Sequence, residues 1–103
     1  MKFGLSDASI QKIHDVFKHY PQVEKVVLYG SRARGDYENG SDIDLTLHGG
    51  ETLTHFIVSK IATDLDGQLL PYTIDLSILS HIRNPELVEQ INRNGVVFYI
   101  RQT

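Results

Sequence analysis

Two short motifs combine residue types that could bind a phosphate and a metal ion side by side. Gly30 and Ser31 close the apolar run 26–29. A small residue there lets a phosphate approach backbone N–H groups, and the serine hydroxyl adds a donor. Asp42 and Asp44 open a second apolar run, and strand alternation would point both carboxylates to one face, where they offer the oxygen ligands of Mg²⁺. Together the motifs indicate nucleotide chemistry.

A third acidic residue, Asp75, stands in the middle of an apolar strand, with Ile74 and Leu76 facing the other way. A lone acid inside a strand is disfavoured, so its presence there calls for a reason. If this strand lies beside the one that carries Asp42 and Asp44, three carboxylates converge and repel one another unless a cation is present. An Asp-x-Asp pair alone could equally be a solvated strand face, but the joint pattern favours metal ligands.

Other polar residues allow more than one interpretation. Arg32 and Arg34 flank the glycine–serine turn and could bind phosphate, which suits the bidentate guanidinium, or form an exposed ion pair with Asp36. Both interpretations stay open for each arginine. The five histidines are scattered along the chain without the short spacing of a metal cluster, so they are expected to be surface or partly buried polar residues.

The elements that must position these residues follow from hydrophobic periodicity and from caps. A helix is expected between the cap Ser6 and Pro21, and another after the cap Asn84 with Pro85 at its first position. The remaining predicted elements are strand 23–29, loop 31–40 opening with a helical turn, strand 42–47, helix 53–67, strand 73–79 and strand 96–100. The order α-β-β-α-β-α-β predicts an α/β (α+β) fold, a small mixed sheet with helices mainly on one face and an open polar face bearing the aspartates.

Composition bounds the function classes. The 103 residues are expected to form a single domain, 1–103, and a net charge of −3 argues against a general DNA-binding protein, which would carry a basic excess. The absence of cysteine excludes disulfides and thiolate metal sites and fits a reducing compartment. No apolar run is long enough to span a bilayer and no signal region is evident, so a cytoplasmic protein without membrane association is expected.

The combination of Gly30-Ser31, Asp42-x-Asp44 and the later Asp75 resembles the nucleotidyltransferase superfamily that includes DNA polymerase β. The spacing and small size are most similar to the minimal nucleotidyltransferases, single-domain prokaryotic proteins often paired with a helical HEPN-domain protein. The resemblance covers most of the chain, from the first helix to the last strand, and it implies the nucleotidyltransferase fold.

The resemblance also implies roles for individual residues. Gly30 and Ser31 would hold the β- and γ-phosphates of a nucleoside triphosphate, and Asp42 and Asp44 would bind Mg²⁺. Asp75 would activate the acceptor hydroxyl, either as a base or as a ligand to a second metal ion. Attack at the α-phosphate would transfer a nucleoside monophosphate and release pyrophosphate, a reaction that depends mainly on positioning and charge neutralisation.

The expected activity is therefore Mg²⁺-dependent transfer of AMP from ATP to a hydroxyl. By the same resemblance the acceptor is a tyrosine of a HEPN-type toxin, with this chain as its antitoxin. Two alternatives remain: a nucleotidyltransferase acting on a small molecule such as an antibiotic, and a non-catalytic nucleotide-binding module that masks its partner. The hydrophobic terminal strand 96–100 is compatible with a homodimer as well as with a hetero-complex.

Overall fold

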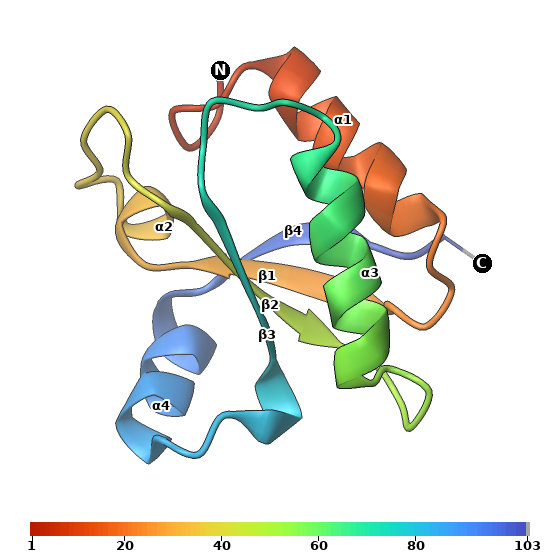
Figure 1. Ribbon diagram of the computed structural model, residues 1–103. Helices are drawn as coiled ribbons and strands as arrows, with labels where there is room; N and C mark the ends of the chain where they lie inside the picture. The colour runs from red at the N-terminus through yellow and green to blue at the C-terminus, as the bar shows by residue number, and fades with distance from the viewer. Residues whose placement is uncertain (103) are drawn as a thin grey trace.

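The computed structural model describes residues 1–102 (Figure 1). In chain order the elements are α1 (Asp7–Lys18), β1 (Lys25–Tyr29), α2 (Ser31–Arg34), β2 (Ile43–His48), α3 (His55–Asp66), β3 (Ile74–Ile78), the 3-10 helix η1 (Leu79–His81), α4 (Pro85–Asn94) and β4 (Val96–Ile100). The predicted order is confirmed. The short helix α2 is the helical turn expected at the start of loop 31–40, and the 3-10 helix η1 is an element that the sequence did not predict. In residues 1–102 no helix has both the length and the apolar character needed to cross a membrane.

Local sequence explains where the elements begin and end. The Ser6 hydroxyl accepts the N–H of Ser9 at 3.1 Å, so Ser6 caps α1 as predicted. The Asn84 side chain accepts the N–H of Glu86 at 3.0 Å and thereby caps α4. β1 is shorter than the predicted strand 23–29, because the N–H of Val23 bonds the carbonyl of Tyr20 in the turn after α1.

The four strands form one mixed sheet in the order β3-β2-β1-β4. β1 is antiparallel to both of its neighbours, β2 and β4. β2 and β3 are parallel, and α3 makes the crossover between them. The mixed sheet predicted from the sequence is confirmed.

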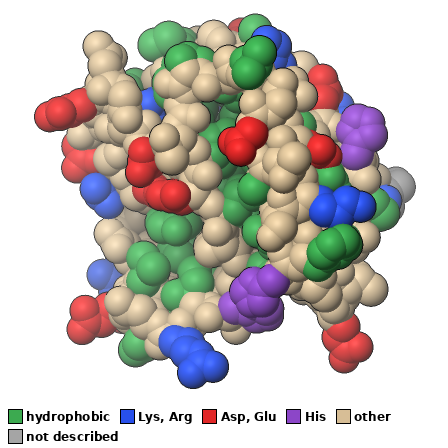
Figure 2. All heavy atoms as spheres, viewed as in Figure 1, with side chains coloured by type: hydrophobic (Ala, Val, Ile, Leu, Met, Phe, Trp, Pro, Cys, Tyr) green, Lys and Arg blue, Asp and Glu red, His purple; other side chains and the backbone are tan. Residues whose placement is uncertain are grey.

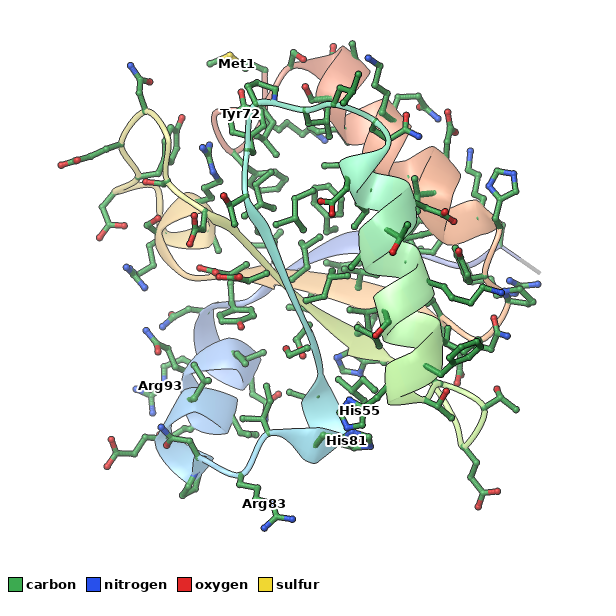
Figure 3. All side chains as sticks on the ribbon, in the orientation of Figure 1. Met1, His55, Tyr72, His81, Arg83 and Arg93 are labelled. Atoms are coloured by element: carbon green, nitrogen blue, oxygen red, sulfur yellow. The ribbon has the colours of Figure 1, made fainter. Side chains whose placement is uncertain are left out.

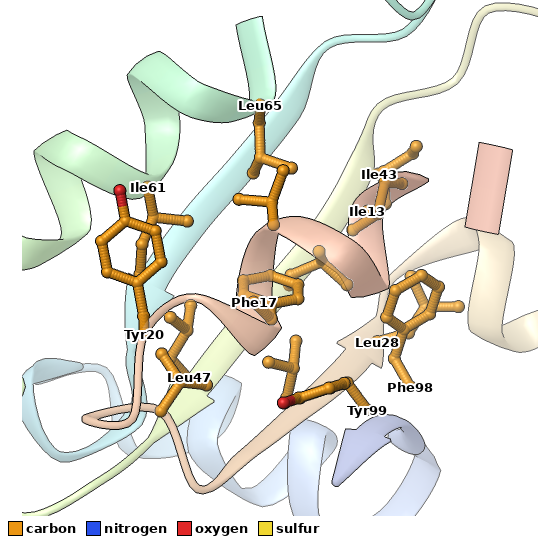
Figure 4. Packing of buried hydrophobic residues seen from close by; sticks show 14 of the residues in the cluster. Ile13, Phe17, Tyr20, Leu28, Ile43, Leu47, Ile61, Leu65, Phe98 and Tyr99 are labelled. Atoms are coloured by element: carbon orange, nitrogen blue, oxygen red, sulfur yellow. The ribbon is translucent and has the colours of Figure 1, made fainter. Parts of the chain in front are cut away.

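The hydrophobic core lies between the sheet and the helices α1 and α3, which pack side by side on one face of the sheet (Figure 1). Phe17 from α1 and Ile61 from α3 are fully buried against β1 and β2 (Figure 4). The core members drawn and labelled in Figure 4 are Ile13, Phe17, Tyr20, Leu28, Ile43, Leu47, Ile61, Leu65, Phe98 and Tyr99. This packing fixes which face of each strand points away from the core.

The helix α4 lies on the opposite face. A Cβ atom at Gly95, directly after α4, would stand 2.6 Å from Cγ1 of Val27, and Val27 alternates with the core residues Val26 and Leu28. Ile91 of α4 is buried at 2 % exposure yet stands outside the core cluster of the other face. The prediction of helices mainly on one face is confirmed, but the polar face is not fully open as expected, since α4 covers part of it.

A hydrogen bond between Tyr20 and Asp64 joins the turn after α1 to α3. It makes the free energy of unfolding depend on pH in the alkaline range. Chiefly because the Tyr20 hydroxyl donates to the Asp64 carboxylate, and because it is buried, the pKa of Tyr20 rises to about 12 from an ordinary value of 10.0. Because the folded-state pKa is raised, the protonated Tyr20 hydroxyl stabilises the folded protein. This contribution is complete below pH 10.0 and is lost as the pH rises through about 12.

We expect the stability difference between the wild type and Tyr20→Phe to shrink across this pH interval, as measured by chemical denaturation at successive pH values. The other tyrosines titrate equally in both proteins and therefore cancel in the comparison. Parallel pH profiles for the two proteins would show that this hydrogen bond carries no pH-dependent stability.

Candidate active site

The pairing of β2 with β3 brings two predicted site residues together. Asp44 and Asp75 are direct register partners across the parallel pair, so their side chains leave the same face of the sheet side by side. The antiparallel pairing of β1 with β2 sets Tyr29 opposite Asp44 on its other side. Asp44 is half-buried and Asp75 is exposed. The predicted adjacency of the two acid-bearing strands is confirmed.

The charges around Asp44 make this an electronegative site. Burial raises the pKa of Asp44, and the negative charges of Asp75 and Asp42 raise it further, whereas the positive charge of Arg34 opposes the shift. Asp42 stands exposed immediately before β2. Figure 2 shows acidic side chains gathered on the side of the molecule that carries α2 and the loop after it. The site therefore favours a cation.

The donor set fits a magnesium ion that shares its coordination with a nucleotide. Among residues 1–102, no three His, Cys, Asp or Glu side chains are arranged to hold a metal ion by themselves. Mg²⁺ is usually bound by one or two carboxylates together with substrate phosphates and water, rather than by an all-protein cage. Asp42 and Asp44 can supply such a pair of carboxylates at the start of β2.

The turn between β1 and α2 packs directly against this acidic cluster. Gly30 has a φ of +78°, and a Cβ atom there would lie 2.3 Å from Oδ2 of Asp44. Only glycine satisfies both the backbone conformation and the close approach. Ser31 follows as the first residue of α2. A phosphate bound at this turn would stand next to the Asp44 carboxylate.

Arg32 is not placed as either interpretation of the sequence expected. Its side chain is buried at 3 % exposure, with Nε and Nη2 donating to the Ser41 carbonyl at 3.1 and 2.9 Å, and Nη1 donating to the Phe3 carbonyl at 2.9 Å. Its guanidinium also lies 5.2 Å from the ring centre of Tyr37 and 5.0 Å from that of Tyr72, which is labelled in Figure 3. Arg32 thus secures the loop that ends at the aspartate pair, and a phosphate contact would require breaking these bonds.

Arg34 is placed differently from Arg32. It is exposed, and its Nε lies 3.3 Å from Oδ2 of Asp36, which is the exposed ion pair considered as an alternative. Its charge nevertheless acts on Asp44, where it offsets part of the rise in the pKa of that carboxyl. Since a surface ion pair of this kind contributes little stability, the contact with Asp36 would not prevent Arg34 from binding a phosphate.

Comparison with family models decides the relationship of the chain. A model described as "Polymerase beta, Nucleotidyltransferase" matches residues 11–103, which is most of the chain. The chain belongs to this nucleotidyltransferase family. A comparison with curated proteins finds no match.

Several solved structures have a fold similar to that of this nucleotidyltransferase. A provisionally assigned minimal nucleotidyltransferase is similar with a TM-score of 0.71 and 25% identity, over 93% of this chain and 95% of that one. A toxin–antitoxin crystal structure with AMP-PNP gives a TM-score of 0.70 and 24% identity, over 95% and 76%. A structure of a tri-AMPylated HEPN toxin of Shewanella oneidensis in complex with an MNT antitoxin gives a TM-score of 0.67 and 20% identity, over 94% of this chain and 74% of that one. These likenesses agree with the nucleotidyltransferase fold.

Three hydroxyl groups lie beside the aspartates, and no role was assigned to any of them from the sequence. The Ser77 hydroxyl donates to the Thr46 hydroxyl at 2.9 Å, and each residue lies two positions beyond an aspartate on its strand. Burial raises the pKa of the Tyr29 phenol, a hydrogen bond with Ser77 opposes the shift, and the charges of Asp44 and Asp75 add to it. Strand alternation places Thr46 and Ser77 on the aspartate face. Tyr29 stands in an apolar run, so nothing in the sequence indicated that its hydroxyl lies near these polar residues.

The contacts of Arg32 lead to a prediction about stability. Arg32→Lys should destabilise the nucleotidyltransferase by about 1–3 kcal/mol, because the single nitrogen of lysine cannot reproduce the planar fork that donates three hydrogen bonds to two carbonyls and lies against two tyrosine rings. Arg34→Lys, the exposed control, should stay within about 0.5 kcal/mol of the wild type. Chemical denaturation measures both values. Unchanged stability with weakened ATP binding in Arg32→Lys would instead assign Arg32 to phosphate recognition.

Proposed function

We propose that this nucleotidyltransferase transfers AMP from ATP to a hydroxyl in a Mg²⁺-dependent reaction. The observation that carries the proposal is the side-by-side placement of Asp44 and Asp75 with the Gly30 turn packed against Asp44. That arrangement puts a place for phosphates, a pair of metal-binding carboxylates and one further carboxylate within a single site. Phosphoryl-type transfer needs positioning and charge neutralisation of this kind.

The proposed acceptor is a tyrosine of a helical HEPN-type protein, for which this chain serves as the antitoxin. Support comes from the relatives of similar fold, one a toxin–antitoxin structure with AMP-PNP and one a HEPN toxin that carries AMP in complex with an MNT antitoxin. The exposure of Asp75 fits an acceptor that belongs to another folded protein, because β3 is an edge strand of the sheet. A tyrosine of the partner can approach this edge without entering a closed pocket.

Each residue has a defined task in the proposed reaction. Gly30 and Ser31 hold the β- and γ-phosphates, while Asp42 and Asp44 hold Mg²⁺. When bound, the metal ion neutralises phosphate charge as it develops at the leaving group. Asp75 takes the proton from the acceptor hydroxyl as its oxygen forms a bond to the α-phosphorus. The bond from that phosphorus to the bridging oxygen breaks, and pyrophosphate leaves with the electron pair.

Labelled ATP tests the proposal directly. The protein is incubated with Mg²⁺ and a HEPN-type protein, using ATP labelled at either the α- or the γ-phosphate. Label from the α-phosphate should appear on a partner tyrosine, as located by mass spectrometry, and label from the γ-phosphate should not. Complex formation without transfer would overturn catalysis and favour the masking module, whereas modification of a small molecule alone would overturn the protein acceptor.

A further inference from the structure

Two histidines from distant parts of the chain meet at one corner of the molecule. His55 is the first residue of α3 and His81 is the last residue of η1, 26 positions further on. Nδ1 of His81 lies 3.2 Å from Nε2 of His55, and the ring centres are 4.8 Å apart. Figure 3 labels the pair, which forms one continuous histidine surface at the same place in Figure 2. Spacing along the sequence gave no indication of a histidine cluster, and the fold creates one.

The separation of the two nitrogens is close to that of a metal chelate. Two imidazole nitrogens bound at 2.0–2.1 Å to one tetrahedral ion stand roughly 3.3 Å apart. The 3.2 Å between Nδ1 of His81 and Nε2 of His55 is close to this value, so the two rings have only to turn until both lone pairs point at one ion. In the metal-free pair one ring donates its N–H to the other, whereas a bound ion would take a lone pair from each facing nitrogen and leave the protons on the outer nitrogens.

We propose that His55 and His81 form a surface site for a divalent transition-metal ion of the Zn²⁺, Ni²⁺ or Cu²⁺ class. Imidazole suits these ions, while Mg²⁺ prefers oxygen, so the site differs in chemistry from the aspartate pair. Both rings are exposed, and within residues 1–102 no third His, Cys, Asp or Glu completes a cluster with them. Water therefore fills the remaining coordination positions. The inference does not rest on the proposed transfer of AMP.

The two histidines are held in place by the folded state. His55 directly follows the cap residue Thr54, whose side chain accepts the N–H of Ile57 at 3.3 Å, so the histidine is carried on ordered backbone. The labelled side chain of Arg83 points away from the pair in Figure 3, which keeps its positive charge off the site. The ion would fasten the start of α3 to the segment after β3. Because unfolding separates the two rings, binding would raise stability by mass action.

Thermal unfolding of the complete chain, with no polyhistidine tag and stripped of metal, tests this site. Saturating Zn²⁺ or Ni²⁺ should raise the Tm by on the order of 5 °C, whereas Mg²⁺ should leave it unchanged. His55→Ala and His81→Ala should each lose this shift, judged within each variant with and without metal. His19→Ala is the matched control, because His19 is an exposed histidine whose Nδ1 bonds only the Asp15 carbonyl of its own helix at 2.8 Å; it should keep the full shift.

NMR of the wild-type imidazoles keeps the inference testable if the variants fold poorly. Substoichiometric Zn²⁺ should perturb the His55 and His81 ring signals together, with saturation at one ion per chain by calorimetry. A wild type without a metal-dependent shift, or the same shift in both histidine variants, would overturn the site. Ring signals that move independently of each other would likewise overturn it.

Discussion

Asp75→Asn should keep binding ATP and Mg²⁺ while its transfer of AMP falls about 10²–10⁴-fold, the usual effect of removing a general base. The proposed metal ligands Asp42 and Asp44 remain, so we expect the nucleotide to stay in place. The asparagine is nearly isosteric and exposed on β3, so the fold has no reason to change. What disappears is the group that we propose takes the proton from the acceptor hydroxyl.

Mass spectrometry of the partner and calorimetric titration with ATP–Mg²⁺ measure the two halves of this expectation. Asp66→Asn removes the same charge at the last residue of α3 and should transfer AMP at the wild-type rate. Equal modification by wild type and Asp75→Asn would remove Asp75 from the mechanism. A joint fall of stability, binding and transfer would show that Asp75 has a structural role instead.

Asp44→Asn should abolish Mg²⁺-dependent nucleotide binding and at the same time stabilise the free protein. Burial first, and then the charges of Asp75 and Asp42, raise the pKa of Asp44 above its ordinary value of 3.8. Because the folded-state pKa is raised, the protonated Asp44 carboxyl favours the folded protein. This contribution to stability is complete below pH 3.8 and is lost as the pH rises through the folded-state pKa. At neutral pH the ionised carboxylate therefore opposes folding, and the neutral amide relieves this repulsion.

The Tm of the free protein at neutral pH and the affinity for ATP–Mg²⁺ check the two expectations for Asp44→Asn separately. Asp42→Asn is the informative companion: it should also lose metal-dependent binding, but its exposed position predicts little change in Tm. Wild-type affinity in both variants would contradict the metal-site assignment. A lower Tm for Asp44→Asn would mean that the carboxylate instead helps to hold the Gly30 turn.

Alternation and capping made much of the fold predictable. Apolar residues on every second position fixed the faces of the strands, and this placed Asp44 and Asp75 on the same face before their register was known. The caps Ser6 and Asn84 marked the starts of α1 and α4, because their side chains satisfy N–H groups only one turn away. These features depend on local sequence.

Features that depend on distant contacts could not be predicted in this way. Arg32 is buried because the carbonyls of Phe3 and Ser41 converge on it, and neither is close to it in sequence. The amphipathic pattern of α4 shows that the helix buries one side, but not on which face of the sheet it lies. His55 and His81 become neighbours only when α3 and η1 are both in place.

The contact between Gly30 and Asp44 also restricts the order in which this site can decay during evolution. Any side chain at position 30 would collide with the Asp44 carboxylate and would have to adopt an unfavourable positive φ. The glycine is therefore easier to replace after a smaller residue has taken the place of Asp44, although the positive φ still disfavours any other residue there. A lineage that retained its partner but abandoned catalysis would first lose the acid and later the glycine, so a homologue with aspartate and a bulky residue at these two positions should be rare.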